Sequence, residues 1–266
     1  MTKNVAVQSD AGDAKSRLRL LSYNIQVGIG STRPSHYVTQ SWKHVLPHSK
    51  SFGNLDRIAK LLSSYDIVGL QETDAGSLRT GFINQTEYLA DKSDFPFWYD
   101  QTNRKLGQIA QHSIGFLSKI EPADVHEHKL PGLIPGRGAM MVRYGRTDNP
   151  LILVLIHLAL GKRARISQLD YISEIVNQFE HVVVMGDMNC KPGSPEMDQL
   201  FRKTKLREPL DELHTFPSWR PMRNIDHILV TPTLKVKEAH VLNHSFSDHL
   251  PIAMEIELPK GVHVLG

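Results

Sequence analysis

The ten residues from His181 to Cys190, HVVVMGDMNC, constrain the fold of this chain more than any other stretch. Val182 to Met185 form an apolar, mostly β-branched run that predicts a short buried strand, which Gly186 ends. Asp187 and Asn189 follow two positions apart, so on an extended chain their side chains point the same way. Polar groups at the carboxyl end of a buried strand occupy the usual ligand position of layered α/β proteins. The same residue types also favour a surface turn, and this stretch alone does not decide between the two interpretations.

Length and composition are those of a globular protein. The 266 residues suffice for one large α/β domain, and the hydrophobic content of 40% can build a sizeable core. A net charge of +3 permits an anionic substrate but does not by itself indicate nucleic acid. The single Cys190 excludes an internal disulfide. The sequence has no apolar leader and no run long enough to cross a membrane, so we expect a cytoplasmic protein. We also expect a monomer, although no motif in the sequence determines the oligomeric state.

Strands and helices are predicted along most of the chain. Residues 1–16 are polar and aperiodic, and we expect a disordered tail. The first strand is predicted at residues 18–25, and Asn54 has the character of a helix N-cap because apolar residues follow it at helical spacing. Between them, residues 28–53 form a long insertion, which could line a substrate groove or be a decorated surface loop. Further strands are predicted at residues 67–70, 97–99, 113–118, 125–130, 138–144, 151–158, 182–185, 224–230, 236–242 and 252–258, and helices at 83–92, 166–179 and 195–203.

Polar side chains recur six times where a predicted strand begins or ends. They are Asn24, Glu72, His157, the pair Asp187 and Asn189, Asp226, and the pair Asp248 and His249. Each one alone has a structural explanation, since a single His after an apolar run is more often a core residue than a catalyst. Together they predict a cleft in which acids bind a divalent cation, amides and His hold phosphate oxygens, and an Asp-oriented His handles a proton.

Other chemistries fit the sequence poorly. It contains no Gly-x-Ser-x-Gly nucleophile elbow, no Walker A loop and no Cys/His spacing typical of zinc sites. Cys190 could serve as a nucleophile, although a small apolar filler is the more common role of such a residue.

The strand-end motifs resemble those of the endonuclease/exonuclease/phosphatase superfamily. The matching segments occur in the family's order and are residues 22–25, 70–72, 156–158, 186–189, 224–228 and 247–251. The resemblance implies a single domain over residues 17–260 with a four-layer α/β sandwich, in which two mixed β-sheets are flanked by helices. It also implies Mg²⁺- or Mn²⁺-dependent attack of water on a phosphoester.

The resemblance also implies roles for individual residues. Glu72 is similar to the principal metal ligand, and Asn24 and Asp248 would complete or support that metal site. Asp187 and Asn189 would orient the attacking water and bind the scissile phosphate.

His249 resembles the catalytic His, which Asp226 would orient, and His157 resembles a second His that binds the phosphate. Whether Asp187 or the Asp226/His249 pair acts as the general base is left open. His157, together with Gln26 where repair enzymes often have an acid, points away from abasic-site repair.

Three functions remain in competition. The first is a phosphodiesterase acting on nucleic acid or a phospholipid head group, the second is a phosphomonoesterase, and the third is a catalytically inactive binding module. An inactive member should have lost at least one key residue, and Glu72, Asp187, Asp248 and His249 are all present. A nuclease would need a basic track for phosphates. Arginines and lysines that could supply one, or could be ordinary surface charge, are Arg33, Lys43, Lys50, Arg104, Lys105, Arg137, Lys162, Arg163, Arg220 and Arg223.

Overall fold

Two mixed β-sheets, one of six and one of five strands, stack face to face at the centre of the protein. The structure, a computed structural model, describes residues 16–28, 49–106, 110–132, 137–209, 213–262 and 264. Residues 1–15 of the expected tail and 29–48 of the insertion lie outside the described residues.

The six-stranded sheet is built around a parallel pair, β1 (Arg17–Asn24) and β2 (Ile67–Asp74). All other neighbours in this sheet are antiparallel. Its strand order is β10-β11-β1-β2-β4-β3, with β10 at Lys235–Val241, β11 at Ile252–Glu257, β4 at Ala110–Ser118 and β3 at Phe97–Leu106. Because β1 and β2 run in the same direction, Asn24 and Glu72 come from the same edge of the sheet.

The five-stranded sheet has the same design, with the parallel pair β7 (Leu151–His157) and β8 (His181–Asp187). His157 and Asp187 are paired in register at the carboxyl ends of these strands. The other strands of this sheet are antiparallel to their neighbours, in the order β5-β6-β7-β8-β9, with β5 at Asp124–Lys129, β6 at Gly138–Tyr144 and β9 at Asp226–Val230.

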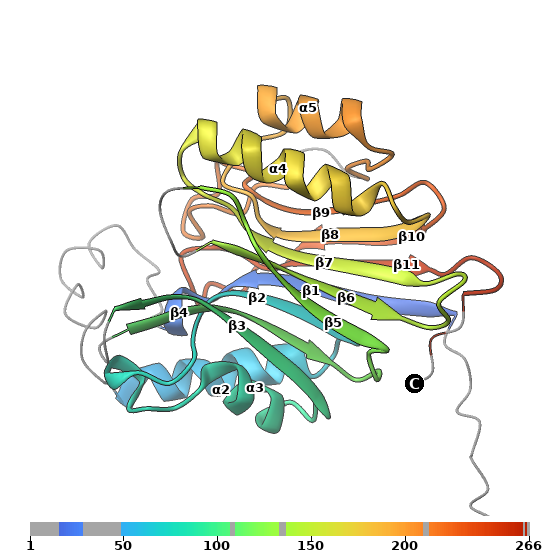
Figure 1. The fold of residues 1–266 in the computed structure, drawn as a ribbon. Coiled ribbons are helices and arrows are strands. Elements are labelled where there is room, and N and C mark those ends of the chain that lie inside the picture. Colours follow the sequence, from blue (N-terminus) through green and yellow to red (C-terminus); the bar gives the residue numbers. More distant parts are fainter. Residues whose placement is uncertain are drawn as a thin grey trace, which may run out of the picture.

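Helices cover the two outer faces, which gives the predicted four layers (Figure 1). Helices α2 (Ser49–Leu62) and α3 (Gln85–Lys92) lie on the six-stranded sheet, and α4 (Lys162–Val176) and α5 (Pro195–Lys203) lie on the five-stranded sheet. Two short 3₁₀ turns, η1 (Gln26–Gly28) and η3 (Leu78–Thr80), follow β1 and β2. No helix in the described part of the chain is both long and apolar enough to span a membrane.

Strand alternation determines which side chains reach the space between the sheets. In β8, Val183 and Met185 join the core between the two sheets, whereas Val182 and Val184 pack against the helical layer. Asp187 continues the inward series and therefore faces the other sheet at the end of β8. The same alternation carries Asn24 inward from β1 and His157 inward from β7, after Leu20 and Leu155.

A glycine lets the sheets approach each other closely near this edge. A Cβ atom added to Gly69 of β2 would lie 2.5 Å from Leu155 and 2.7 Å from Met185. Any larger residue would push these core side chains away and widen the space between the two sheets. The polar strand ends just beyond Gly69 are thereby held within reach of one another.

Helix α2 begins earlier than the sequence pattern predicts, at Ser49 rather than after Asn54. The Asn54 side chain is buried inside the helix and does not cap it. Its amide donates hydrogen bonds to the backbone carbonyls of Gly28, at 3.2 Å, and Phe246, at 2.6 Å. Asn54 thus connects α2 to the turn after β1 and to the loop that carries Asp248 and His249. In the sequence, a residue with this long-range role has the same local pattern as an N-cap.

Candidate active site

All eight predicted site residues come from one edge of the sandwich, where β1, β2, β7 and β8 end and β9 begins. The Asn24 side chain donates a 3.1 Å hydrogen bond to Asp187 Oδ2 across the two sheets. His157 Nε2 lies 3.6 Å from Asp187 Oδ2 and 4.0 Å from Glu72 Oε1. Asn24 and Asp187 are thus in contact although they lie 163 positions apart in the chain. We refer to the space between these eight side chains as the cleft.

Glu72 reaches the cleft only because β2 contains a bulge. By simple alternation Val68 and Leu70 face the helices, and Glu72 would follow them. The pairing with β4 shifts between Leu70 and Thr73, and Glu72 has a left-handed φ of 54°. The bulge reverses the phase of the strand and turns the carboxylate towards His157. Its side chain remains 35% exposed, so a ligand can reach it.

The turn after β8 fixes Asp187 and Asn189. Gly186 has a φ of 143°, and a Cβ atom there would overlap the carbonyl oxygen of Ile156, so no other residue fits. Asn189 has a left-handed φ of 53°, and its backbone N–H donates to Asp187 Oδ1 at 2.9 Å. The Asn189 side chain donates to the carbonyl of Leu158 at 3.0 Å. This turn holds both polar groups rigidly at the end of the strand.

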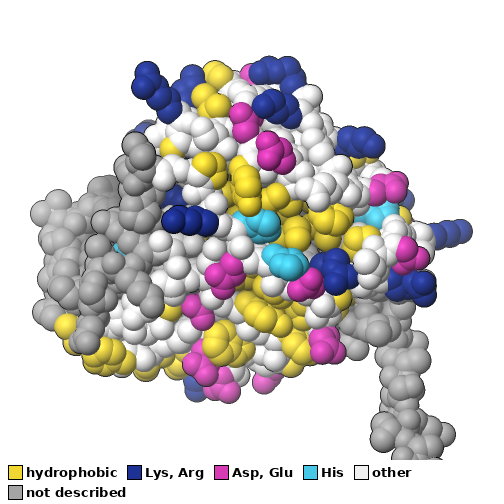
Figure 2. Space-filling view, in the orientation of Figure 1, with side chains coloured by type: hydrophobic (Ala, Val, Ile, Leu, Met, Phe, Trp, Pro, Cys, Tyr) yellow, Lys and Arg dark blue, Asp and Glu magenta, His cyan; other side chains and the backbone are white. Residues whose placement is uncertain are grey.

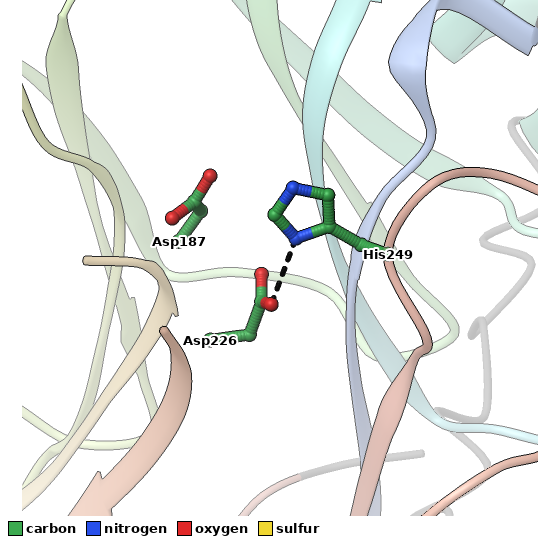
Figure 3. A group of neighbouring side chains, drawn as sticks. All are labelled: Asp187, Asp226 and His249. Carbon is green, nitrogen blue, oxygen red and sulfur yellow. Dashed lines mark hydrogen bonds and ion pairs between the residues drawn. The ribbon is translucent and has the colours of Figure 1, made fainter. Parts of the chain in front are cut away.

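Asp226 and His249 form a buried pair, as drawn in Figure 3. His249 Nδ1 lies 2.8 Å from Asp226 Oδ2, which also accepts a 2.5 Å hydrogen bond from the Thr215 hydroxyl. The Phe216 ring packs against the imidazole with its centroid 4.8 Å away. Figure 3 shows the other ring nitrogen of His249 on the side away from Asp226, where Asp187 lies across the gap.

The charges around this pair favour a protonated His249. Burial disfavours the imidazolium, but the charge and hydrogen bond of Asp226 outweigh it and raise the pKa of His249 to about 10. Burial and repulsion by Asp226 raise the pKa of Asp187 to about 7. Partial burial and repulsion by Asp248 also raise the pKa of Glu72. The cleft thus holds one cationic imidazole beside carboxyl groups that ionise reluctantly.

The pKa of His157 is shifted in the opposite direction from that of His249. Burial, then the charges of Arg137 and His249, lower its pKa well below the usual value, so this imidazole is neutral. Arg137 Nη1 lies 2.7 Å from His157 Nε2 and 3.0 Å from Nδ1. In the sequence, Arg137 is only a basic residue within a segment rich in Pro and Gly. The structure places its guanidinium beside His157 in the cleft. A guanidinium beside a neutral imidazole can hold the oxygens of a phosphate.

The carboxyl groups of the cleft fit a divalent cation. Asp226 Oδ1 is buried and has no hydrogen-bond partner among the described residues, and burial with repulsion between neighbouring carboxylates raises the pKa values of Asp187 and Glu72. Hard divalent cations bind such carboxylate and amide oxygens. Within the described residues, ligand atoms of Asp187, Asp226 and His249 lie within 4.8 Å of one another. This group differs from the predicted set of Asn24, Glu72 and Asp248, and His249 Nδ1 in it is already hydrogen-bonded to Asp226.

Several supporting residues were not identified from the sequence. Thr215 lies between the predicted helix at residues 195–203 and the strand at 224–230, where no element is predicted, yet it is fully buried and its hydroxyl donates a hydrogen bond to Asp226. Ser218 donates to the carbonyl of Ser247, and the Ser247 hydroxyl donates to Asp248 Oδ1 at 3.1 Å. His227 directly follows Asp226 and contacts Glu208 and Cys190 behind the cleft. A Thr, a Ser or a second His has many uses in a protein, so only the tertiary contacts reveal these roles.

Comparison with known structures finds the same fold in proteins of very different sequence. An endonuclease/exonuclease/phosphatase family protein from Bacteroides thetaiotaomicron matches with a TM-score of 0.69 and 17% identity, over 91% of this chain and 98% of that one. A mannosyl-6-phosphatase from the same organism matches with a TM-score of 0.67 and 18% identity, over 90% of this chain and 99% of that one. The human Nocturnin catalytic domain matches with a TM-score of 0.66 and 16% identity, over 92% of this chain and 95% of that one.

Comparison with curated proteins gives no match. A sequence profile, however, covers most of the chain. The profile of the Endonuclease/Exonuclease/phosphatase family matches residues 21–249, which include every predicted site residue. Together with the two mixed sheets and their flanking helices, this match shows that the chain belongs to the endonuclease/exonuclease/phosphatase family.

Proposed function

We propose that this protein is a Mg²⁺- or Mn²⁺-dependent phosphodiesterase. The observation that carries the proposal is the arrangement of the Asp226/His249 pair, which faces Asp187 in the same cleft as Glu72 and Asn24. One cleft thus combines a positioned proton donor, a carboxyl group with a pKa near neutrality and further oxygen ligands. Each of these parts can accelerate the metal-dependent attack of water on a phosphoester.

The two titratable groups suggest a division of labour. With a pKa of about 7, Asp187 is partly ionised at neutral pH and can take a proton from the attacking water. His249, with a pKa of about 10, is protonated and donates a hydrogen bond to the phosphate or a proton to the leaving oxygen. This supports Asp187 over the Asp226/His249 pair as the general base.

The other polar groups of the cleft would act on the phosphate. Asn24 orients Asp187 through its amide, and Arg137 with His157 would balance the charge that develops on the phosphate oxygens. A cation held by Glu72, with Asn24 and Asp248 in support, would add Lewis-acid polarisation of the phosphoester.

The rim of the site favours a substrate with several phosphates. Exposed cations lie in the segments that follow β7, follow β8 and precede β9, and residues 158–163, 190–194 and 213–224 contain no Asp or Glu. These exposed cations are Lys162, Arg163, Lys191, Arg220 and Arg223. Figure 2 shows further Lys and Arg side chains over the helical layer of α4 and α5, but Asp and Glu side chains lie among them, whereas the rim segments carry cations without acids. Such charge favours nucleic acid over a zwitterionic phospholipid head group.

A phosphomonoesterase is the second candidate, because a similar structure is described as a mannosyl-6-phosphatase. A substrate panel with purified protein separates the two functions. We expect Mg²⁺ or Mn²⁺ to support hydrolysis of bis-p-nitrophenyl phosphate and of a single-stranded oligonucleotide, faster than p-nitrophenyl phosphate. EDTA should stop both reactions. An oligonucleotide duplex with an abasic site should not be preferred, and sphingomyelin should react slowly.

The controls decide what each result means. The Glu72→Gln protein, purified in the same way, should be nearly inactive on every substrate, which excludes a contaminating nuclease. Faster cleavage of the monoester than of the diester would favour the phosphatase. A wild-type protein that binds Mg²⁺ but hydrolyses nothing on the panel would contradict the proposed function.

A further inference from the structure

A second buried histidine lies directly behind the catalytic pair. Residues alternate along β9, so Asp226, Ile228 and Val230 face the other sheet while Leu229 packs towards α4 and α5. His227 shares the side of Leu229 and is completely buried. It therefore cannot touch a substrate in the cleft, although its neighbour in sequence, Asp226, lines that cleft.

His227 bridges two groups that only accept hydrogen bonds in their usual states. Its Nδ1 lies 2.7 Å from Glu208 Oε1, and its Nε2 lies 2.8 Å from the carbonyl oxygen of Cys190. A carbonyl cannot donate, so Nε2 must carry the proton of that bond. Glu208 is itself largely buried, with its side chain 10% exposed, which makes this pair an internal structure and not a surface ion pair.

The carbonyl that His227 holds belongs to the catalytic turn. Cys190 directly follows Asn189, whose left-handed backbone and side chain are fixed by Asp187 and Leu158. The turn is also tied to the start of β9, because Met188 N–H donates to the carbonyl of Ile225 at 2.8 Å. The His227 side chain adds a second hydrogen bond between this turn and β9, at Cys190, one residue after Asn189, and at His227, one residue after Asp226.

We propose that His227, held by Glu208, is a positioning residue that clamps the turn of residues 187–190 to β9. This inference rests on the proposed function, since it assigns the clamp to the geometry of Asp187, Asn189 and Asp226 during hydrolysis. Without the clamp the Cys190 carbonyl loses its partner, and the turn can move relative to Asp226. A shift of a fraction of an ångström in such groups is enough to lower a catalytic rate.

The protein contains a matched control at the other end of β8. His181 is also buried and also bridges two partners, with Nδ1 2.9 Å from Thr233 Oγ1 and Nε2 2.9 Å from Asn149 Oδ1. It begins the strand that ends at Asp187. His181→Phe and His227→Phe each remove two side-chain hydrogen bonds, from opposite ends of one strand pair. Because only His227 has a charged partner, Glu208→Gln is needed as well, to separate the loss of that charge from the effect of position.

The first experiment measures both variants for thermal stability and for steady-state hydrolysis of bis-p-nitrophenyl phosphate with Mg²⁺. Both should melt a few degrees below wild type. Only His227→Phe should also lose kcat, by roughly 10- to 100-fold as for other supporting residues, with KM changed much less. Glu208→Gln, which can still hydrogen-bond the imidazole, should keep most of the rate that Glu208→Ala loses. Equal rates in His227→Phe and wild type, or equal losses in the two Phe variants, would overturn the clamp.

The second experiment does not depend on activity. Amide hydrogen exchange of a peptide spanning residues 187–192 should be faster in His227→Phe than in wild type and unchanged in His181→Phe. Unchanged exchange in both variants contradicts the clamp even if the protein proves to hydrolyse nothing. A wild-type protein that is inactive, but in which only His227→Phe loosens this turn, would reject the proposed function and retain the clamp.

Discussion

Buried polar groups at the two ends of strand β8 lie in opposite environments: their hydrogen bonds are satisfied at one end, and like charges face one another at the other. At the amino end, His181 is bonded to a hydroxyl and an amide, and burial lowers its pKa so that it stays neutral. At the carboxyl end, Asp187 faces Asp226 and Glu72, and its pKa rises to about 7. The same strand therefore ends in a satisfied neutral network on one side and in a cluster of interacting charges on the other.

This difference indicates where the protein retains unfavourable interactions. Burying like charges together costs folding free energy, and Asp226 Oδ1 also has no hydrogen-bond partner in the part of the chain that the structure describes. Packing between the sheets does not explain why four acids, Glu72, Asp187, Asp226 and Asp248, lie at this edge. At the other end of β8, the buried His181 is satisfied by a hydroxyl and an amide. The unbalanced end is the one that a cation and a phosphate would complete, and the following predictions test this assignment.

The largest effect should come from the Asp226/His249 pair. His249→Ala should lower kcat for a diester by roughly 10²- to 10⁴-fold, the range for losing a positioned acid or base. Asp226→Asn should keep the fold and also lose rate, and the double variant should be little worse than His249→Ala, because residues that act as a unit are not additive. Steady-state kinetics with His181→Ala as the control measures this. Losses that multiply, or that follow melting temperature and not kcat, would make the pair structural.

The next effect concerns the metal ligands. Glu72→Gln keeps the size of the side chain but removes its charge, and we expect hydrolysis to fall by roughly 10²- to 10³-fold and to need more Mg²⁺ for half-maximal rate. Isothermal titration with Mg²⁺ gives the affinity directly. If Glu72→Gln binds Mg²⁺ normally while Asp187→Asn does not, the cation belongs to the group of Asp187, Asp226 and His249 and the predicted set is wrong.

Much of the fold follows from the sequence because local rules decide it. The predicted bounds of β6 and α5, residues 138–144 and 195–203, coincide with the observed elements, since an apolar run between turn residues and a helix that begins at Pro195 carry their own boundary signals. The sequence pattern also indicates which polar residues stand at strand ends, and parallel pairing brings Asn24, His157 and Asp187 to one edge.

The remaining features depend on contacts between distant segments. The orientation of Glu72 contradicts the two-residue period of its strand, because the bulge is visible only in the pairing of β2 with β4. Asn54 follows the pattern of an N-cap, but it bonds the loop before β11 across 192 positions. Arg137 and Thr215 reach the site from turns whose sequences do not predict a direction. No local pattern encodes these contacts, so single-sequence reasoning could not find them.

A smaller effect should appear in how the free energy of unfolding depends on pH, because only the carboxyl end of β8 lies beside a histidine with a raised pKa, His249. The pKa of His249 is raised from 6.5 to about 10, so the folded protein holds this proton more tightly than the unfolded chain. This stabilisation is fully present below pH 6.5 and is lost as the pH rises towards 10; Asp187 acts in the same sense between about pH 3.8 and 7. Without metal, the free energy of unfolding should fall between pH 6.5 and 10, by at most about 1.4 kcal/mol per pH unit for one group.

Urea unfolding in EDTA at several pH values measures this dependence. Asp226→Asn should flatten the slope above pH 6.5, because His249 loses its charged partner, whereas a His181→Gln variant should keep it. Mg²⁺ should stabilise the protein more at high pH, when the carboxyl groups are ionised. Stability that rises through this range in EDTA would contradict a protonated His249.

The smallest effect should come from the basic rim, and it depends on the substrate. Arg223 lies over the Phe216 ring, which in turn packs against His249, so its guanidinium is near the cleft but outside the reacting groups. A variant with Arg220→Gln and Arg223→Gln should raise KM for a single-stranded oligonucleotide several-fold at low salt and leave bis-p-nitrophenyl phosphate, which has one phosphate, almost unchanged. The slope of log affinity against log salt should become shallower by about 0.7 for each lost contact. Arg202→Gln, an exposed charge on α5, serves as the control. An equal loss on both substrates would mean that the rim supports the catalytic pair, and no loss on either would remove the argument for a polyanionic substrate.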